Sequence, residues 1–155
     1  MTNNLSAGTR VKALDFPRAF QVFNTTTISN ISTTTYVKGT PEIAVRFVAP
    51  SSGRVAVHVG AGTSNDGANN DRIFIAFQIL EGDPANGTVF QSAESKRGVS
   101  NPATQVDRDQ FHGHTTMVNG LTPGTYYYAQ MLHRVTLGSA TADIAHRHLM
   151  VWPIP

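Results

Sequence analysis

Apolar side chains recur at every second residue along much of this chain, and this alternation restricts its fold more than any other feature. The pattern runs through residues 43–48 and resumes at 54–59, after the turn APSSG. Successive side chains of a strand point to opposite faces, so a period of two is typical of half-buried strands. We expect these two stretches to form a hairpin across the short Pro/Ser/Gly connection.

Other stretches also favour strands. RIFIAFQILEG is apolar on both faces, as expected of a central strand covered on each side, and GTVFQSA could pair back on it through the turn GDPANG. RAFQVF and TISNISTTTYV are rich in β-branched and aromatic residues. Because no helical apolar repeat is sustained, the sequence predicts an all-β fold: a single antiparallel β-sandwich, either jelly-roll or immunoglobulin-like.

The length of 155 residues predicts one domain with a substantial core. Residues 1–18 lack strong alternation and are interpreted as an extended N-terminal arm, with the sandwich domain spanning 19–155. Residues 92–110 form the most polar stretch and are expected to be a long exposed loop, which leaves open whether they bind a ligand.

The composition excludes several classes of function. Cysteine is absent, so disulfides, thiolate metal sites and cysteine nucleophiles are excluded. Arg and Lys are scattered, which gives no footprint for nucleic acid, and no apolar run could span a membrane. MTNNLSAGTR has no apolar signal-peptide core, so we expect synthesis in the cytoplasm without export by a signal peptide. Charged residues make up only 14% of the chain, which suggests that another subunit covers part of its surface.

The most specific stretch is NGLTPGTYYYAQMLHRV. Its spacing of Leu121, Pro123, Gly124 and Tyr127 resembles the tyrosine corner of fibronectin type III and related sandwiches, in which the tyrosine hydroxyl bonds back to the backbone. The single Trp lies at position 152, whereas the fibronectin pattern has one early in the chain. This structural corner therefore indicates architecture and not activity.

Histidines are the main candidates for chemistry. His112 with His114, and His146 with His148, are each two residues apart, so each pair could offer two imidazoles to one metal, with Asp107, Asp109 or Asp143 completing the site. HGH invites comparison with cupins, yet the following HTTMVNGL lacks the glutamate that the cupin pattern needs. We expect no metal and no cofactor, and we interpret these histidines as half-buried hydrogen-bonding groups.

Other catalytic and nucleotide-binding patterns fail. GAGTSNDGANND matches neither a dinucleotide loop nor a phosphate loop, and its spacing fits no EF-hand. No G-x-S-x-G elbow is present, and nothing in the sequence pairs two carboxylates for glycoside hydrolysis. We therefore expect no enzymatic activity.

The last strand alternates Ile144, His146, His148, Met150 and Trp152 on one side with the remaining residues on the other. Both sides mix apolar and polar residues, which suits a sheet that packs on its own core and on a neighbouring subunit. We predict that His146, His148, Met150 and Trp152 form an interface of a symmetric homo-oligomer.

The succession of TISNISTTTYV, VRFVAPSSGRVAVHVGAG, NDRIFIAFQILEG, GLTPGTYYYAQMLHRV and TADIAHRHLMVWPIP is similar to small β-rich virion proteins of tailed bacteriophages that infect actinobacteria, of the capsid-decoration and minor-tail type. The resemblance covers most of residues 28–155. It implies a non-enzymatic, trimeric β-sandwich located in the virion. The major capsid or tail protein would be its partner, with the N-terminal arm as the attachment segment.

Two alternatives stay open. The chain could be a receptor- or carbohydrate-binding module of a phage tail, which would contact a host surface glycan through Tyr126, Tyr128 or residues 92–110. It could also be a histidine-based metalloenzyme of cupin-like form. The sequence does not decide between capsid and tail attachment.

Overall fold

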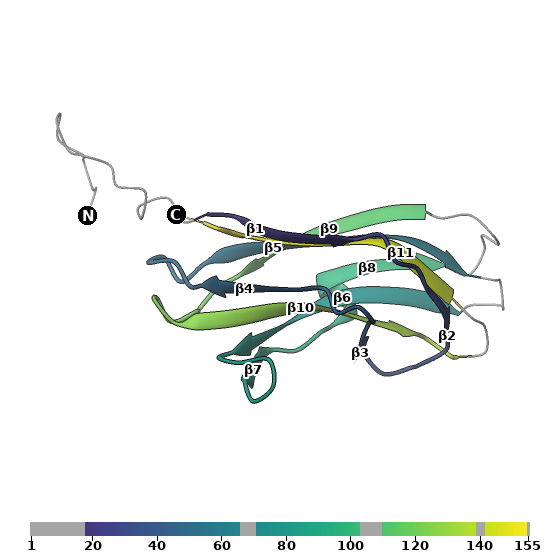
Figure 1. Cartoon of the computed structure of the whole chain (residues 1–155), viewed down its shortest axis with the longest axis horizontal. Helices are drawn as coiled ribbons and strands as arrows, with labels where there is room; N and C mark the ends of the chain where they lie inside the picture. The colour runs from purple at the N-terminus through teal and green to yellow at the C-terminus, as the bar shows by residue number, and fades with distance from the viewer. Residues whose placement is uncertain (1–17, 66–70, 103–109, 139–141, 155) are drawn as a thin grey trace.

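The computed structural model describes residues 18–65, 71–102, 110–138 and 142–154. These residues form two antiparallel sheets that pack face to face, which confirms the predicted β-sandwich (Figure 1). Within these ranges there is no α-helix, only the short 3-10 helix η2 (Ser95–Arg97), and no helix that could cross a membrane. The predicted N-terminal arm, apart from Arg18, lies outside the described residues.

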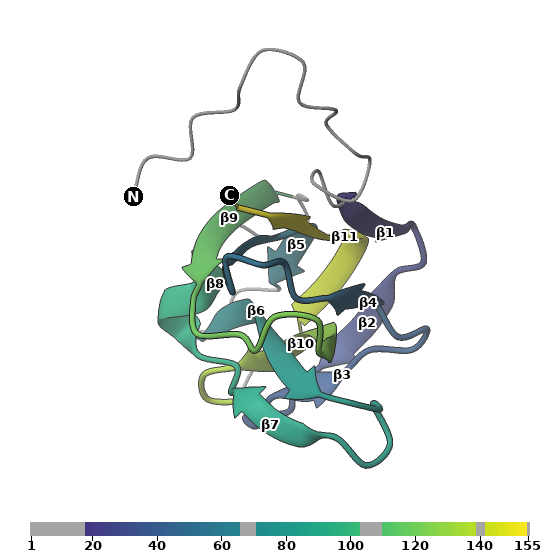
Figure 2. The same cartoon turned by 90° about the vertical axis from the view of Figure 1, so that its left-hand side faces the viewer.

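The first sheet, sheet A, has the order β1-β11-β5-β9, and β2 also pairs with β11. Its strands are β1 (Phe20–Asn24), β2 (Ile28–Ile31), β5 (Val55–Asn65), β9 (Gln110–Val118) and β11 (Ala142–Pro153). Figure 2 shows this sheet from its end, with β1 and β9 at its two margins.

The second sheet, sheet B, has the order β3-β10-β6-β7, with β4 also paired to β10 and β8 to β6. Its strands are β3 (Val37–Lys38), β4 (Ala44–Val48), β6 (Arg72–Glu81), β7 (Thr88–Gln91), β8 (Gly98–Pro102) and β10 (Tyr126–Val135). When the interrupted strands β1/β2, β3/β4 and β7/β8 are each counted once, the chain crosses between the sheets at every connection except that from β6 to β7, which is the order of a jelly roll. This topology decides between the two predicted sandwich types.

The core lies between the sheets and consists of the apolar residues that alternate inward. Val55, Val57 and Val59 of β5 face Ile73, Ile75 and Phe77 of β6 across the sandwich, and each of these side chains is 1% exposed or less. Strand β6 lies between β10 on one side and β7 and β8 on the other, which confirms its predicted central position. The predicted pairing of GTVFQSA with β6 is also confirmed, because Val89 pairs with Leu80.

The predicted hairpin of residues 43–48 with 54–59 is wrong. Strand β4 pairs with β10 in sheet B, whereas β5 pairs with β11 and β9 in sheet A. The turn APSSG therefore carries the chain from one sheet to the other. Alternation reports only which side chains are buried, so it cannot distinguish strands that pair within a sheet from strands that pack across the core.

The prediction of one long loop over residues 92–110 is also wrong in its described part. Residues 98–102 form β8, whose register runs from Gly98 opposite Ala76 to Pro102 opposite Arg72 of β6. The buried Asn101 donates from Nδ2 to the backbone oxygen and to Oγ1 of Thr63 in the other sheet, at 3.1 and 3.0 Å. Polar residues occur in this strand because it joins the two sheets through hydrogen bonds.

Asp71 holds the end of β10 beside the start of β6. Its side chain is fully buried, and Oδ1 accepts from the backbone N–H groups of Arg72, Thr136 and Leu137 at 2.9–3.0 Å. A carboxylate oxygen that accepts several backbone N–H groups satisfies donors that burial would otherwise leave unpaired.

Candidate functional site

The structural corner lies at the entry to β10. Pro123 and Gly124 occupy the turn, where Gly124 has a φ of 80° that favours glycine, and the Gly124 N–H donates to the backbone oxygen of Ala49. Tyr127 is fully buried, and its hydroxyl accepts from the backbone N–H of Thr122 at 3.1 Å. Leu121, 3% exposed, packs in the core below the turn. This geometry is that of a tyrosine corner, here at the start of a jelly-roll strand.

A β-bulge in β11 decides where the predicted interface histidines point. Ala145 pairs with Gly62 and His148 with Gly60, so two residues of β11 oppose one of β5. His146, at the bulge, has a φ of 50°. The extra residue reverses the alternation, so Ile144 is buried in the core. The sequence pattern had placed Ile144 on the same side as His148, and that prediction is wrong.

After the bulge, His148, Met150 and Trp152 are half-buried on the outer face of sheet A, and His146 is exposed. Neighbouring strands place further side chains in the same rows: Met150 pairs with His58 and Gln21, and Trp152 with Ala56. We call this surface the histidine face. Its members are Gln21, Phe23, Ala56, His58, Gly60, Gly62, Phe111, Gly113, Thr115, Met117, His146, His148, Met150 and Trp152.

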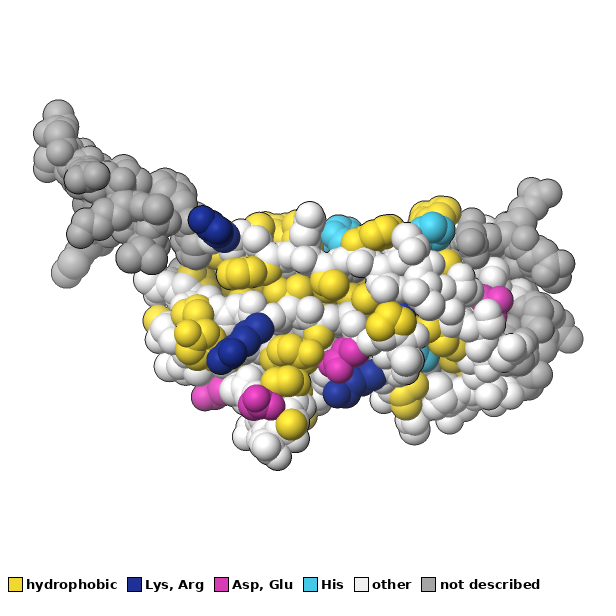
Figure 3. Space-filling view, viewed as in Figure 1, with side chains coloured by type: hydrophobic (Ala, Val, Ile, Leu, Met, Phe, Trp, Pro, Cys, Tyr) yellow, Lys and Arg dark blue, Asp and Glu magenta, His cyan; other side chains and the backbone are white. Residues whose placement is uncertain are grey.

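The histidine face contains no Lys, Arg, Asp or Glu. Its large apolar side chains are open to solvent, with Phe23 58%, Phe111 67% and Met117 52% exposed. In Figure 3, hydrophobic and histidine side chains follow the upper margin of the molecule, whereas most charged side chains lie lower, over sheet B. Exposed, uncharged apolar surface of this kind is typical of protein interfaces.

Glycines allow the rings of this face to lie against the backbone. A Cβ on Gly113 would come within 2.8 Å of the His58 ring, and one on Gly62 within 3.0 Å of the Phe111 ring. The rings also contact one another: the centroid of His148 lies 5.6 Å from that of His58, and Phe111 lies 5.6 Å from His146. The sheet therefore presents a level surface of aromatic and imidazole groups.

His58 is the electrostatically distinctive member of the face. Its Nδ1 lies 3.0 Å from Oγ1 of Thr115. Burial lowers the pKa of His58, and the neighbouring His148 and His114 lower it further. The imidazole of His58 therefore favours its neutral form, which suits a face without counter-charges.

The two histidine pairs considered as metal ligands lie on opposite sides of sheet A. His112 pairs with Ala61 and His114 with Val59, so both lie on the inward side of β9, whereas His146 and His148 lie on the outer face. Asp107 and Asp109 lie outside the described residues, and Oδ1 of Asp143 accepts from the Asn30 N–H at 2.9 Å. Across the described ranges, no three His, Asp or Glu side chains come together as a metal site.

The sequence analysis missed a buried basic pair. Arg147 is 2% exposed, and it donates from Nη1 to the Pro41 backbone oxygen at 2.8 Å and from Nη2 to Asn24 Oδ1 at 3.2 Å. His133 is 6% exposed, and burial together with the charge of Arg147 lowers its pKa to about 4. The available signal was alternation, which places Arg147 on the same side of the last strand as Leu149 and Val151, both of which are buried.

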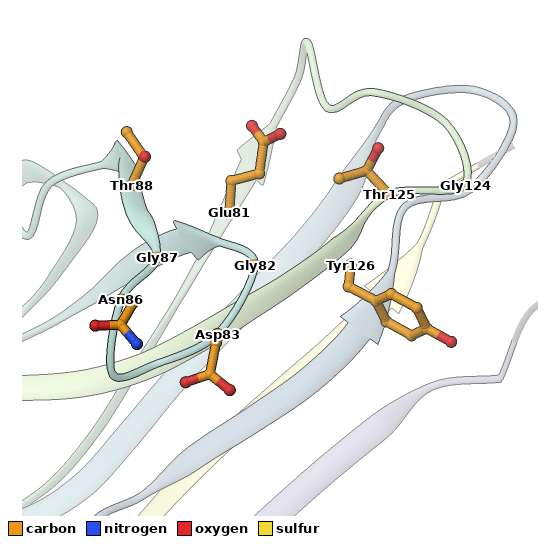
Figure 4. A pocket seen from close by; sticks show the side chains of 9 residues that line it. All are labelled: Glu81, Gly82, Asp83, Asn86, Gly87, Thr88, Gly124, Thr125 and Tyr126. Carbon is orange, nitrogen blue, oxygen red and sulfur yellow. The ribbon is translucent and has the colours of Figure 1, made fainter.

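A shallow hollow of about 650 Å³ lies in sheet B, where β6 ends and β10 begins. It includes Glu81, Asp83, Asn86 and Tyr126. Figure 4 shows that these side chains point in different directions and do not converge on a common point. Tyr126 is 52% exposed, with the guanidinium of Arg46 4.3 Å from its ring centroid. Nearby, the Tyr128 hydroxyl donates to Glu42 Oε1 at 3.2 Å.

No protein-family model and no curated protein sequence matches the chain. Among solved structures, the infectious bursal disease virus VP2 subviral particle is similar over 88% of this chain, with a TM-score of 0.51 and 11% identity. A bacteriophage CBA120 tailspike domain and a structure described as CBM4 are similar with TM-scores of 0.40 and 0.41, both at 12% identity. They cover 88% and 73% of this chain, and 19% and 61% of their own chains.

The chain spans 32% of the VP2 chain that it matches. At this level of identity, the similarity to VP2 shows a shared fold. The similarity agrees with the jelly-roll order of the strands. Function is therefore inferred from the surface residues of this chain.

Proposed function

We propose that the protein is a non-enzymatic structural component of a virion, which binds a capsid or tail protein as a symmetric oligomer. The observation that carries the proposal is the histidine face, whose exposed aromatic and apolar side chains are free of formal charge. Contact with another subunit would remove this surface from water, and a second copy could approach it without repulsion between like charges.

The predicted interface residues all belong to this face. They lie along β11: His146, His148, Met150 and Trp152. Phe23 of β1 contacts His146 from one side of the strand, and Phe111 of β9 contacts it from the other. The phage-protein resemblance implies a trimer, and we adopt that number. Many identical copies on a repeating shell would strengthen modest individual contacts through multivalency.

Sedimentation velocity on the full chain tests the oligomer. Phe23→Asp places a charge on the histidine face beside His146 and His148 and should abolish the trimer. Val89→Asp is the matched control, because Val89 is also exposed, at 49%, but lies on β7 of sheet B. A monomeric wild type, or equal effects of both substitutions, would overturn the assignment of this face.

Attachment to particles is tested separately. Deletion of residues 1–18 should abolish binding to purified virions that lack the protein, while the circular-dichroism spectrum and melting temperature stay those of the sandwich. Full occupancy by the truncated chain would refute the role of the N-terminal arm as the attachment segment.

A second candidate is a receptor- or carbohydrate-binding module of a phage tail. It is favoured by Tyr126, an exposed aromatic ring beside the hollow of sheet B, because sugar rings stack on such side chains. Binding to a panel of bacterial surface glycans that Tyr126→Ala abolishes would support this candidate over the structural role. No binding by the wild type would exclude it.

A further inference from the structure

Strand β9 forms an open edge of sheet A. It pairs with β5 through an unbroken register from Gln110 opposite Thr63 to Val118 opposite Val55, and the described part of the chain supplies no strand on its other side. In an antiparallel sheet, alternate residues of an edge strand direct their N–H and C=O groups away from the neighbour, where they can accept another strand.

This edge differs from the others of the sandwich. β9 has nine residues, whereas the remaining described edge strands, β1, β2, β3, β4, β7 and β8, have five or fewer. Proteins protect long edges with charges, prolines or bulges. The sequence QFHGHTTMV contains neither charged residues nor proline, and its register has no bulge. An unprotected edge of this length is suited to pairing with another chain.

We propose that β9 of a second copy of this chain adds antiparallel to β9, with the two-fold axis at His114. His114 is the central residue of the strand, so this register pairs all nine residues of each copy. In this register each outer-face residue of one copy lies opposite an outer-face residue of the other. The outer faces of the two copies of sheet A therefore lie on the same side of the joined sheet.

The side chains fit this register. Phe111 of one copy lies opposite Met117 of the other, and this pairing occurs twice, once on each side of the axis. Both side chains are exposed in the single chain, at 67% and 52%, and the flexible methionine thioether can pack on the outer edge of the Phe111 ring, which lies over Gly62. The two His114 residues face each other at the axis.

The contact uses the edge of the sheet and does not depend on the proposed function of the histidine face. If both contacts form, the two-fold pairing of edges links one face-assembled oligomer to the next. A protein that covers a repeating shell could use such a link to join neighbouring copies.

Engineered cysteines test the register directly, because the chain has no cysteine of its own. Under mild oxidation of the full chain, His114→Cys should form a disulfide-linked dimer across the axis, since directly opposed residues have the separation that a disulfide needs. Phe111→Cys and Met117→Cys should each stay unlinked alone and should cross-link with each other when mixed. All three positions are exposed, so the folded state should tolerate them.

Absence of cross-linking by His114→Cys in a folded protein would overturn the proposal, and self-linking by Phe111→Cys or Met117→Cys would overturn the register. In a reduced sample, His114→Lys should raise the dissociation constant of the edge pair by about fivefold through like charges at the axis. Adding Phe23→Asp to the His114→Cys variant separates this inference from the proposed function. It should remove the face contact and leave the cross-link intact.

Discussion

His133 gives the protein a defined loss of stability in mild acid. Burial, reinforced by the charge of Arg147, lowers its pKa from 6.5 to about 4 in the folded chain. The unfolded chain binds a proton at the ordinary value, so below that pH it carries more protons than the folded chain. The free energy of unfolding must therefore fall as the pH decreases from about 6.5 towards 4, and His133 contributes nothing to this dependence at higher pH.

The size of the effect follows from the two pKa values. Between about pH 7.5 and pH 5, the linkage relation gives a loss of about 2 kcal/mol from His133 alone. The lowered pKa of His58 acts in the same direction. A variant is therefore needed to isolate the part due to His133.

Urea denaturation of wild type and His133→Gln at several pH values between about 7.5 and 5 measures this part. The substitution removes the titrating group, so the fall in unfolding free energy with acid should be about 2 kcal/mol smaller in the variant. The difference between pH values cancels any constant packing cost of glutamine. Equal pH dependence in the two proteins, or an NMR titration that shows folded His133 protonating near pH 6.5, would refute the reasoning.

Three further substitutions test individual contacts, each by urea denaturation. Tyr127→Phe removes the corner hydroxyl and leaves a backbone donor unpaired, so it should cost about 1–2 kcal/mol, whereas Tyr126→Phe at the exposed neighbour should change stability by less than about 0.5 kcal/mol. Gly98→Ala would press its Cβ against the Ile75 backbone oxygen and should cost about 2 kcal/mol or more; a neutral result would contradict this close strand approach. Asp71→Ala loses an acceptor for three backbone N–H groups and should cost about 3 kcal/mol, with Asp71→Asn, which keeps one side-chain oxygen, less destabilising; equal losses would argue against the hydrogen bonds as the cause.

Sequence patterning predicted the layers of the fold better than their connections. Alternation located β4, β5 and β11, because a half-buried strand must place apolar side chains on one face, and the run RIFIAFQILEG, apolar on both faces, located β6. It failed for the pairing of residues 43–48 with 54–59, since strands on opposite sides of one core have the same pattern as strands side by side. It also missed β8, whose Asn101 is buried through hydrogen bonds and not through apolarity.

The sequence by itself determined the all-β class, the absence of disulfides and the outward-facing apolar residues of the last strand. Each of these depends on residue identity or on the local period of two. Only the tertiary structure decided which residues join this surface, because the bulge at His146 moves Ile144 from the predicted row into the core and strand pairing brings His58 beside His148. The tertiary structure also decided that β9 is an edge strand of sheet A. Whether a strand has one neighbour or two depends on the chain topology, which the local sequence does not specify.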